Sequence, residues 1–267
     1  MPRIFLVISL FVLFSCNRHF HLSLPAASAN AMTGTEFYKQ VGAMKWNERE
    51  PIAEKEILSG NMPSFIKQFV PINVFLKDSS GKTINATYFV SPDYLSIGND
   101  KNWARIPLTP MTAQRIADSL HCFLPTRKMV DDIYQQATVK LEPVPLYAFR
   151  DSALIFWHHH LIIEGQRKNR KGLIAGIKKD VVLSGKVTRD TKSNRVAIYG
   201  WHKPDGKAIQ PLYTGHVDWY VDYSHGIRLV SRNIKVNGKW MDYIDVLKDP
   251  VLKGILCDEE FCDFLRY

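Results

Sequence analysis

The sequence has few cysteines, and their spacing excludes the common cysteine-based sites. None of the four matches a zinc finger or a Cys-x-x-Cys redox pair. Apart from Cys16, three remain, so at most one internal disulfide can form. Cys257 and Cys262 could close a small loop near the C-terminus and leave Cys122 free, or Cys122 could pair with either of them. The sequence leaves this pairing open.

Long apolar runs are also scarce. The only one, Ile4 to Phe14, follows Arg3 and has about the length of a signal-peptide core, which is too short to span a bilayer comfortably. It ends in Leu13-Phe-Ser-Cys16, which resembles the lipobox of bacterial lipoproteins, where the cysteine is lipidated and becomes the mature N-terminus. We therefore expect residues 1–16 to be a signal peptide and the protein to be exported, with membrane contact only through a lipid anchor. A soluble periplasmic or extracellular form, cut near Ala27 to Ala31, is the alternative.

Acidic residues are fewer than basic ones, 26 against 35, so the formal net charge is +9. Loss of the first fifteen residues removes only Arg3, which leaves the mature protein basic. Basic exported proteins often meet anionic polymers, so we expect an envelope or extracellular polymer as the partner. Export makes nucleic acid an unexpected partner. The densest basic cluster, Arg167 to Lys171, is interpreted as a solvated turn.

The sequence shows no internal repeat, and its composition is that of an ordinary globular protein. Residues 17–34 are rich in Ser, Ala and Asn, which predicts a flexible tether. Residues 35–267 are expected to form a single α+β domain, with N-terminal and central helices packed on a mainly antiparallel sheet.

Several segments carry clear secondary-structure signals. Asp78 to Gly81 predicts the turn of a β-hairpin. Thr112 is expected to cap a helix, and a second helix is expected after Pro125. The predicted helices are Glu36–Met44, Glu50–Leu58, the segment from Thr112 to Leu120, and Thr126–Ala137. The predicted strands include Val70–Leu76, Thr83–Val90, Asp180–Leu183 and Arg195–Trp201.

The stretch from Thr214 to Leu229 alternates polar and apolar residues with nearly strict period two. Because successive strand side chains point to opposite faces, this pattern predicts one strand with one chemical face. The residues that would share this polar face are His216, Asp218, Tyr220, Asp222 and Ser224. The other face would carry Val217, Trp219, Val221 and Tyr223 into a core.

Histidine and aspartate on such a face could bind a metal. His216 and Asp218 form a His-x-Asp pair, which could hold a divalent metal such as zinc with His202, His158 or His160 as a third ligand. A hydrogen bond across the sheet is the alternative interpretation of the pair. The run His158 to His160 lies among apolar residues, so at least one of its imidazoles should be neutral and hydrogen-bonded.

Two nucleophile arrangements are less favoured. Ser224 and His225 are adjacent, so on a strand they would point in opposite directions. The letters from Ser224 to Leu229 resemble the Ser-His-Gly-Cys-Ile-Arg-Leu signature of L,D-transpeptidases, but the cysteine is missing after Gly226, so that chemistry cannot be carried over. Cys122 followed by a distant histidine is similar to the layout of papain-like envelope peptidases, with a buried or disulfide-bonded cysteine as the alternative.

These observations favour an exported hydrolase that acts on peptidoglycan or a polysaccharide. The expected catalytic residues are His216, Asp218, Asp222 and His225, and the expected substrate-binding residues are Trp201, Trp219, Tyr220 and Arg228. Arg228 could pair with Asp222 or bind an anionic group, and Lys178 and Lys179 could do similar work. The alternative is a non-catalytic surface lipoprotein that binds glycan or peptide through aromatic side chains.

Overall fold

The computed structural model describes residues 20–267, so the expected signal peptide and Cys16 lie outside the described residues. The described chain has an α+β fold, as the sequence predicts. Its helices are α1 (Gly34–Val41), α2 (Trp46–Leu58), α3 (Pro110–Ser119), α4 (Arg127–Gln136), α5 (Ala153–Arg167), α6 (Lys186–Arg189) and α7 (Tyr243–Lys248), with 3-10 turns at Ser64–Lys67 and Leu252–Ile255. None of these helices combines the length and apolar character needed to cross a membrane.

The larger sheet has the order β1-β2-β3-β13-β6, and β14 joins it beside β3 and pairs with β15. Its strands are β1 (Phe20–His21), β2 (Gln68–Lys77), β3 (Thr83–Val90), β6 (Cys122–Phe123), β13 (Val230–Ser231), β14 (Asn233–Val236) and β15 (Lys239–Asp242). The long hairpin of β2 and β3 reverses at Asp78, whose Oδ1 accepts hydrogen bonds from the backbone N–H groups of Ser80 and Lys82. The predicted hairpin is therefore confirmed.

The smaller sheet has the order β11-β10-β9-β12, and it positions the candidate site. Its strands are β9 (Lys179–Val182), β10 (Arg195–His202), β11 (Ala208–Val217) and β12 (His225–Gly226), of which only β12 and β9 run parallel. One face packs Val181 and Ile198 into the main core, whereas the other packs Val182 and Ala197 against Val130 of α4. Two further short pairs are β4 (Ser96–Asn99) with β5 (Asn102–Arg105), and β7 (Val139–Lys140) with β8 (Ile174–Ala175).

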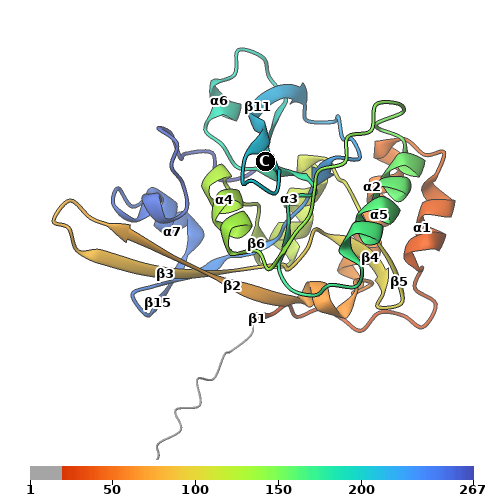
Figure 1. Cartoon of the computed structure of the whole chain (residues 1–267), viewed down its shortest axis with the longest axis horizontal. Coiled ribbons are helices and arrows are strands. Elements are labelled where there is room, and N and C mark those ends of the chain that lie inside the picture. Colours follow the sequence, from red (N-terminus) through yellow and green to blue (C-terminus); the bar gives the residue numbers. More distant parts are fainter. Residues whose placement is uncertain (1–19) are drawn as a thin grey trace, which may run out of the picture.

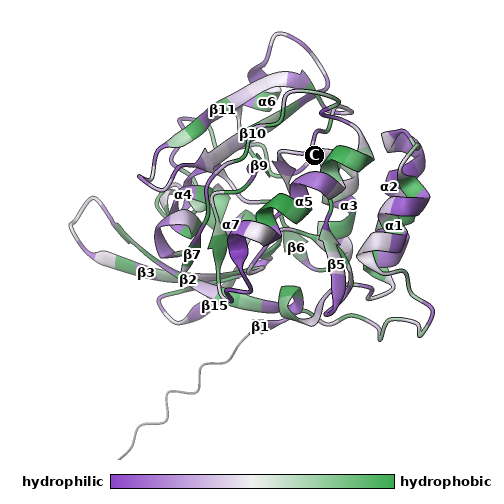
Figure 2. Ribbon diagram, turned by 45° about the vertical axis from the view of Figure 1, so that its right-hand side comes forward, coloured by the Kyte–Doolittle hydropathy of each residue, from purple (hydrophilic) through white to green (hydrophobic). Residues whose placement is uncertain are grey.

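Helices α1, α2 and α5 gather at one end of the molecule beside β4 and β5, while the β2–β3 hairpin extends toward the other end (Figure 1). β11 lies above β2 and β3 in Figure 1, and Figure 2 shows β9, β10 and β11 above β2, β3 and β15. The loop before β12 and the segment that leads into α5 are in contact, since Tyr223 N donates to Arg150 O at 2.9 Å.

The folded body begins earlier than the sequence composition indicates. Phe20 pairs with Phe69 of β2, and Leu22 is only 2% exposed. Phe20, Leu22 and Leu24 all pack against the main core, so residues 20–34 are part of the domain rather than a flexible tether. The physical reason is that Phe20, Leu22 and Leu24 alternate with other residues, so their side chains point to one face and pack on the core. The segment as a whole is nevertheless rich in Ser and Ala.

Helix ends explain two smaller differences from prediction. The helix expected to begin at Thr112 begins at Pro110, because proline suits the first helical position and its missing N–H costs nothing there. The arginines of the basic cluster serve the end of α5: Arg170 donates from Nε to Arg167 O and from Nη2 to Gln166 O. The cluster therefore forms the predicted turn, with its arginines satisfying carbonyl groups at the helix C-terminus.

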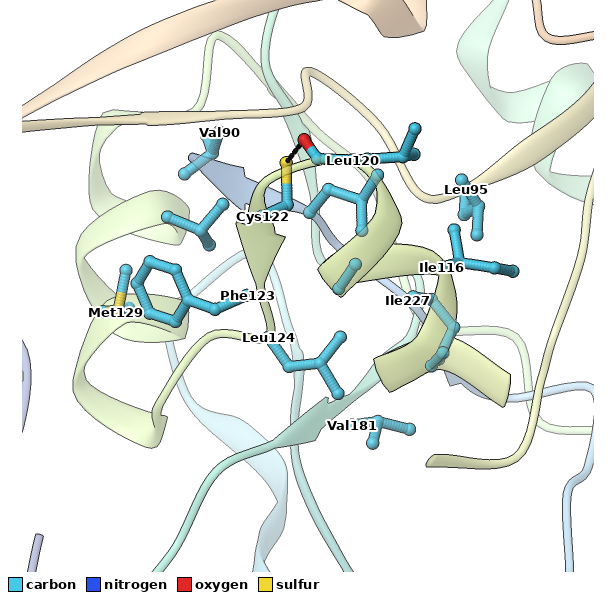
Figure 3. Packing of buried hydrophobic residues seen from close by; sticks show 14 of the residues in the cluster. Val90, Leu95, Ile116, Leu120, Cys122, Phe123, Leu124, Met129, Val181 and Ile227 are labelled. Atoms are coloured by element: carbon cyan, nitrogen blue, oxygen red, sulfur yellow. Dashed lines mark hydrogen bonds between the residues drawn. The ribbon is translucent and has the colours of Figure 1, made fainter. Parts of the chain in front are cut away.

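The three cysteines of residues 20–267 form one disulfide and leave one buried thiol. Cys257 and Cys262 are bonded, and Cys122 is free and buried. Figure 3 shows Cys122 on β6 among apolar side chains, with its Sγ donating to Leu120 O at 3.3 Å. Burial raises the pKa of this thiol, so it is not a thiolate at neutral pH. Cys122 therefore lacks the activated state that a papain-like nucleophile requires.

Candidate functional site

The stretch predicted as one strand forms two strands and a reversal. β11 ends at Val217, and Tyr220 N donates to Val217 O at 3.0 Å, closing a turn through Asp218 and Trp219. The chain then returns to β12, which starts at His225. The prediction of a single strand from Thr214 to Leu229 is therefore wrong, and its polar residues do not line one straight face.

The reversal brings two histidines together on the smaller sheet. His216 of β11 pairs with Val196 of β10 at one edge of the sheet. His225 of β12 pairs in parallel with Lys179 of β9 at the other edge. Their ring centroids are 5.8 Å apart. Tyr220 lies between strands and stacks on His216 with ring centroids 4.7 Å apart. On a single strand, alternation would put the His225 side chain on the opposite face from His216. The turn at Asp218 and Trp219 instead brings the two side chains together.

Asp222 is the buried anchor of this cluster. Its Oδ1 accepts hydrogen bonds from Ser224 N at 2.8 Å and Ser224 Oγ at 2.5 Å, and its Oδ2 accepts from Arg150 Nη2 at 2.7 Å and Tyr220 OH at 3.3 Å. Burial alone would raise the pKa of Asp222, but the neighbouring His225, the Ser224 bonds and the Arg150 charge together lower it to about 2. Asp222 is thus an ionised carboxylate.

Both imidazoles above it are neutral at neutral pH. Burial lowers the pKa of His225 to about 4, although Asp222 opposes the shift. Burial also lowers the pKa of the partly buried His216; Asp222 opposes this shift, whereas Lys179 and Arg150 add to it. The Nε2 of His225 lies 4.0 Å from Asp222 Oδ1 and has no hydrogen-bond partner among the described residues. A buried, unpartnered imidazole nitrogen is costly, which is the kind of feature that functional sites retain.

Two cations flank the cluster. Arg150 pairs with Asp222, and Lys179 extends from β9 with its Nζ 4.9 Å from the ring centroid of Trp201. Burial lowers the pKa of Lys179. The indole Nε1 of Trp201 is buried without a hydrogen-bond partner. The expected site residue Trp201 therefore lies beside Lys179, and its ring centroid is 6.4 Å from that of Tyr223.

A second buried layer supports this side of the sheet. Lys178 Nζ contacts His159 Nδ1 at 3.2 Å and donates to Tyr223 O. Burial lowers the pKa of Lys178 to about 7 and also lowers the pKa of His159, so this imidazole is neutral. Gly226 is packed so closely that an added Cβ would lie 2.5 Å from Tyr94 Cδ1 and 2.6 Å from Lys178 Cβ.

Two expected site residues, Asp218 and Arg228, lie elsewhere. The turn carries Asp218 away from His216; its backbone N–H donates to Asn194 O, and Arg195 is the charged side chain that acts on its carboxylate. Arg228 is buried, and its guanidinium donates to Ser91 O and Ile174 O beside Asp180, so it pairs with neither Asp222 nor an external group.

The expected metal ligands are not brought together. His202 pairs with Ala208 at the opposite end of the β10–β11 hairpin from His216 and contacts Asp131 at 2.9 Å. His158 is exposed on α5, while His160 is buried beside Arg105. Between residues 20 and 267, no group of three or more His, Cys, Asp or Glu side chains is arranged to hold a metal ion. The predicted zinc set therefore does not fit this geometry.

A groove of about 480 Å³ opens next to the cluster. It runs between the start of α2, the start of α5 and the 217–221 loop, and Tyr220 is common to the groove and to the histidine cluster. Trp219, an expected substrate-binding residue, is 46% exposed at this groove. Comparison of the chain with protein-family models, curated proteins and solved structures found no match.

Sequence reasoning missed Arg150 and gave Lys179 only a minor place. Arg150 lies in an irregular segment 72 residues before its partner Asp222, and no local pattern connects the two. Lys179 belongs to a short strand whose neighbour β12 is two residues long, too short to predict from sequence. The signal that could have drawn attention to Lys179 is a lysine pair that Asp180 separates from the apolar run Val181 to Leu183.

Proposed function

We propose that this chain is an exported hydrolase that acts on a cell-envelope or extracellular polymer through His216 and His225. The observation that carries the proposal is the pair of neutral imidazoles next to the ionised Asp222, with one buried ring nitrogen left unpartnered. A neutral imidazole is a general base at neutral pH. Export and attachment by a lipid anchor rest on the sequence of the first sixteen residues.

In this proposal His216, the more accessible ring, accepts a proton from a water molecule as the water oxygen bonds to the scissile carbon. His216 then returns that proton to the leaving group as the scissile bond breaks. His225 is buried, with its ring centroid 5.8 Å from that of His216, and it positions the His216 ring. Lys179 adds its positive charge to stabilise the negative charge that develops on the substrate oxygen. Asp222 stays ionised and, through Ser224 and Arg150, fixes the loop that precedes β12.

The test uses the purified protein with peptidoglycan and a panel of polysaccharides, with and without chelator. His216→Ala is expected to lower turnover by about 10²-fold or more, the usual contribution of a general acid or base. His225→Ala is expected to lower turnover as well, because the His216 ring loses a neighbour that positions it. His158→Ala, which alters an exposed histidine of α5, is the matched control. Activity that both site variants retain in full would overturn the proposed mechanism, and thermal melting of each variant separates loss of catalysis from loss of folding.

The groove favours a second candidate, a non-catalytic glycan- or peptide-binding lipoprotein. Its specific support is Trp219, an exposed aromatic side chain at a groove of ligand size. The same substrate panel distinguishes the candidates. Binding without turnover in wild-type protein, unchanged in His216→Ala, would favour the binding protein.

A further inference from the structure

The groove beside the histidine cluster is flanked by the N-termini of two long helices. Ser152 is the N-cap of α5, and its side chain makes no capping hydrogen bond. Lys45 is the N-cap of α2, and its backbone N–H donates to Glu48 Oε2 at 2.9 Å, so a carboxylate already lies at the N-terminus of α2. The start of α5 therefore presents first-turn N–H groups and the positive end of a helix dipole at the groove.

A buried arginine lies at the same groove with part of its hydrogen-bonding capacity unused. Arg49 is 4% exposed, and its Nη1 donates weakly to Met44 O and Asp151 O, each at 3.3 Å, which are carbonyls of groove-lining residues. Its Nε is buried without a partner among the described residues. An unpaired guanidinium N–H beside the uncapped N-terminus of α5 is an arrangement that suits an anion.

The remaining charges of the groove favour the same sign of ligand. Lys45 adds a cation, and Asp151 is the acidic residue among those that line the groove. Asp151 lies directly before the N-cap of α5, where a carboxylate interacts favourably with the helix dipole. The positive groups thus outnumber the one carboxylate.

Aromatic rings supply the other half of the recognition surface. Trp219 and Trp46 both line the groove, and Trp219 is nearly half exposed. A flat indole face packs well against the apolar face of a sugar ring. Tyr220 lines the groove and stacks on His216, so a ligand in the groove lies next to the proposed catalytic histidine.

We propose that this groove binds a carboxylate-bearing glycan, with a sugar ring on Trp219 and its carboxylate at the N-terminus of α5. The inference rests on the proposed hydrolase, whose substrate class it names. The carboxylate can belong to a uronic acid or to the lactyl group of a peptidoglycan glycan strand. These two sources share the recognition chemistry and are separated by the probes.

Binding is measured by calorimetry on the His216→Ala protein, which removes turnover from the experiment. The probes are a galacturonic acid tetramer, its methyl ester, and peptide-free peptidoglycan glycan strands. The acid tetramer or the glycan strands are expected to bind, whichever source is correct. The methyl ester should bind at least tenfold more weakly than the acid, and added salt should weaken the acid only.

Variants test each part of the groove. Trp219→Ala should weaken binding at least tenfold, whereas Trp240→Ala, which alters a 57% exposed tryptophan on β15, should leave it unchanged. Ser152→Asp should supply the missing cap and raise the melting temperature while weakening acid binding at least tenfold. Asp151→Asn should tighten acid binding. A misfolded protein cannot produce this combination.

Equal binding of the acid and its ester would overturn the proposal, as would full acid binding by Trp219→Ala or by Ser152→Asp. Binding of neither acidic glycan would also overturn it, and an acidic peptide that binds in a Trp219-dependent way would assign the groove to peptides instead. If the wild-type protein binds the glycan but shows no turnover, only the proposed hydrolase activity is refuted. If turnover occurs and neither Trp219→Ala nor Ser152→Asp changes it, only the proposed glycan site in the groove is refuted.

Discussion

Replacing Asp222 by asparagine tests whether the buried carboxylate holds the candidate site together. Asp222 is fully buried, and its two oxygens accept four hydrogen bonds from three neighbouring residues. An asparagine keeps the shape, but its NH2 group must face a donor from either Arg150 or Ser224. The variant therefore loses a charge-assisted pair and gains one donor–donor conflict.

The size of the effect follows from the pKa of Asp222, which falls from its ordinary value of 3.8 to about 2. Each pKa unit corresponds to roughly 1.4 kcal/mol, so the ionised form contributes on the order of 2 kcal/mol to folding. Because the folded pKa lies below the unfolded one, this contribution is complete above about pH 4 and is lost as the pH falls toward 2. We expect Asp222→Asn to cost about 2 kcal/mol at pH 7 and progressively less below pH 4.

Urea unfolding of wild type and variant at pH 7, 5, 4 and 3 measures this difference. His225 also titrates in this range, with a pKa of about 4, so the same comparison is made in a His225→Asn background. In this background the difference in stability between the protein that retains Asp222 and the one that carries Asp222→Asn should still decrease below pH 4. The decrease should be smaller, because His225 itself helps to lower the pKa of Asp222. A stability difference that is constant from pH 7 to pH 3 would refute the reasoning.

Two further predictions concern the packing behind the site. Gly226→Ala should destabilise the protein by about 1–3 kcal/mol because its Cβ meets Tyr94 and Lys178, whereas Gly165→Ala on α5, with nothing within 4 Å, should stabilise it by roughly 0.5–1 kcal/mol; thermal melts that rank the two variants in the opposite order would contradict the packing described. Lys178→Met removes a buried amine whose pKa falls from 10.5 to about 7, so the unfolded state binds more protons between these values and wild-type stability should rise with pH across that window. Denaturation at pH 7 and pH 10 measures the stability of Lys178→Met relative to wild type, which should be lower at pH 10 than at pH 7. A stability difference that does not change with pH would argue against a perturbed lysine.

Local patterns predicted much of the fold. The β2–β3 hairpin and the helix after Pro125 were both visible, because Asp78 to Gly81 and Thr126 are local turn and cap signals. Residues 20–34 were misjudged because three apolar side chains within a polar segment are enough to add a strand to a sheet edge. Composition averaged over such a window does not reveal that contact.

The candidate site was predicted in part. His216, Asp222, His225 and Tyr220 do meet, but Asp218 leaves the group at a turn that contains neither glycine nor proline. Period two continues unbroken through that turn, so alternation cannot distinguish a straight strand from a reversal. The partner of Asp222 was beyond prediction for another reason, since Arg150 reaches it only through tertiary packing held by Tyr223.

If Cys16 carries the proposed lipid, the pairing of Phe20 with β2 limits how far the folded domain can lie from the membrane surface. The Cα atoms of Cys16 and Phe20 are four peptide units apart, which span at most about 14 Å when fully extended. A lipid-anchored form would then hold the edge of its larger sheet within a short distance of the bilayer surface. Such a protein would work on polymer segments that come down to the membrane, and distant layers of the envelope would lie outside its radius of action.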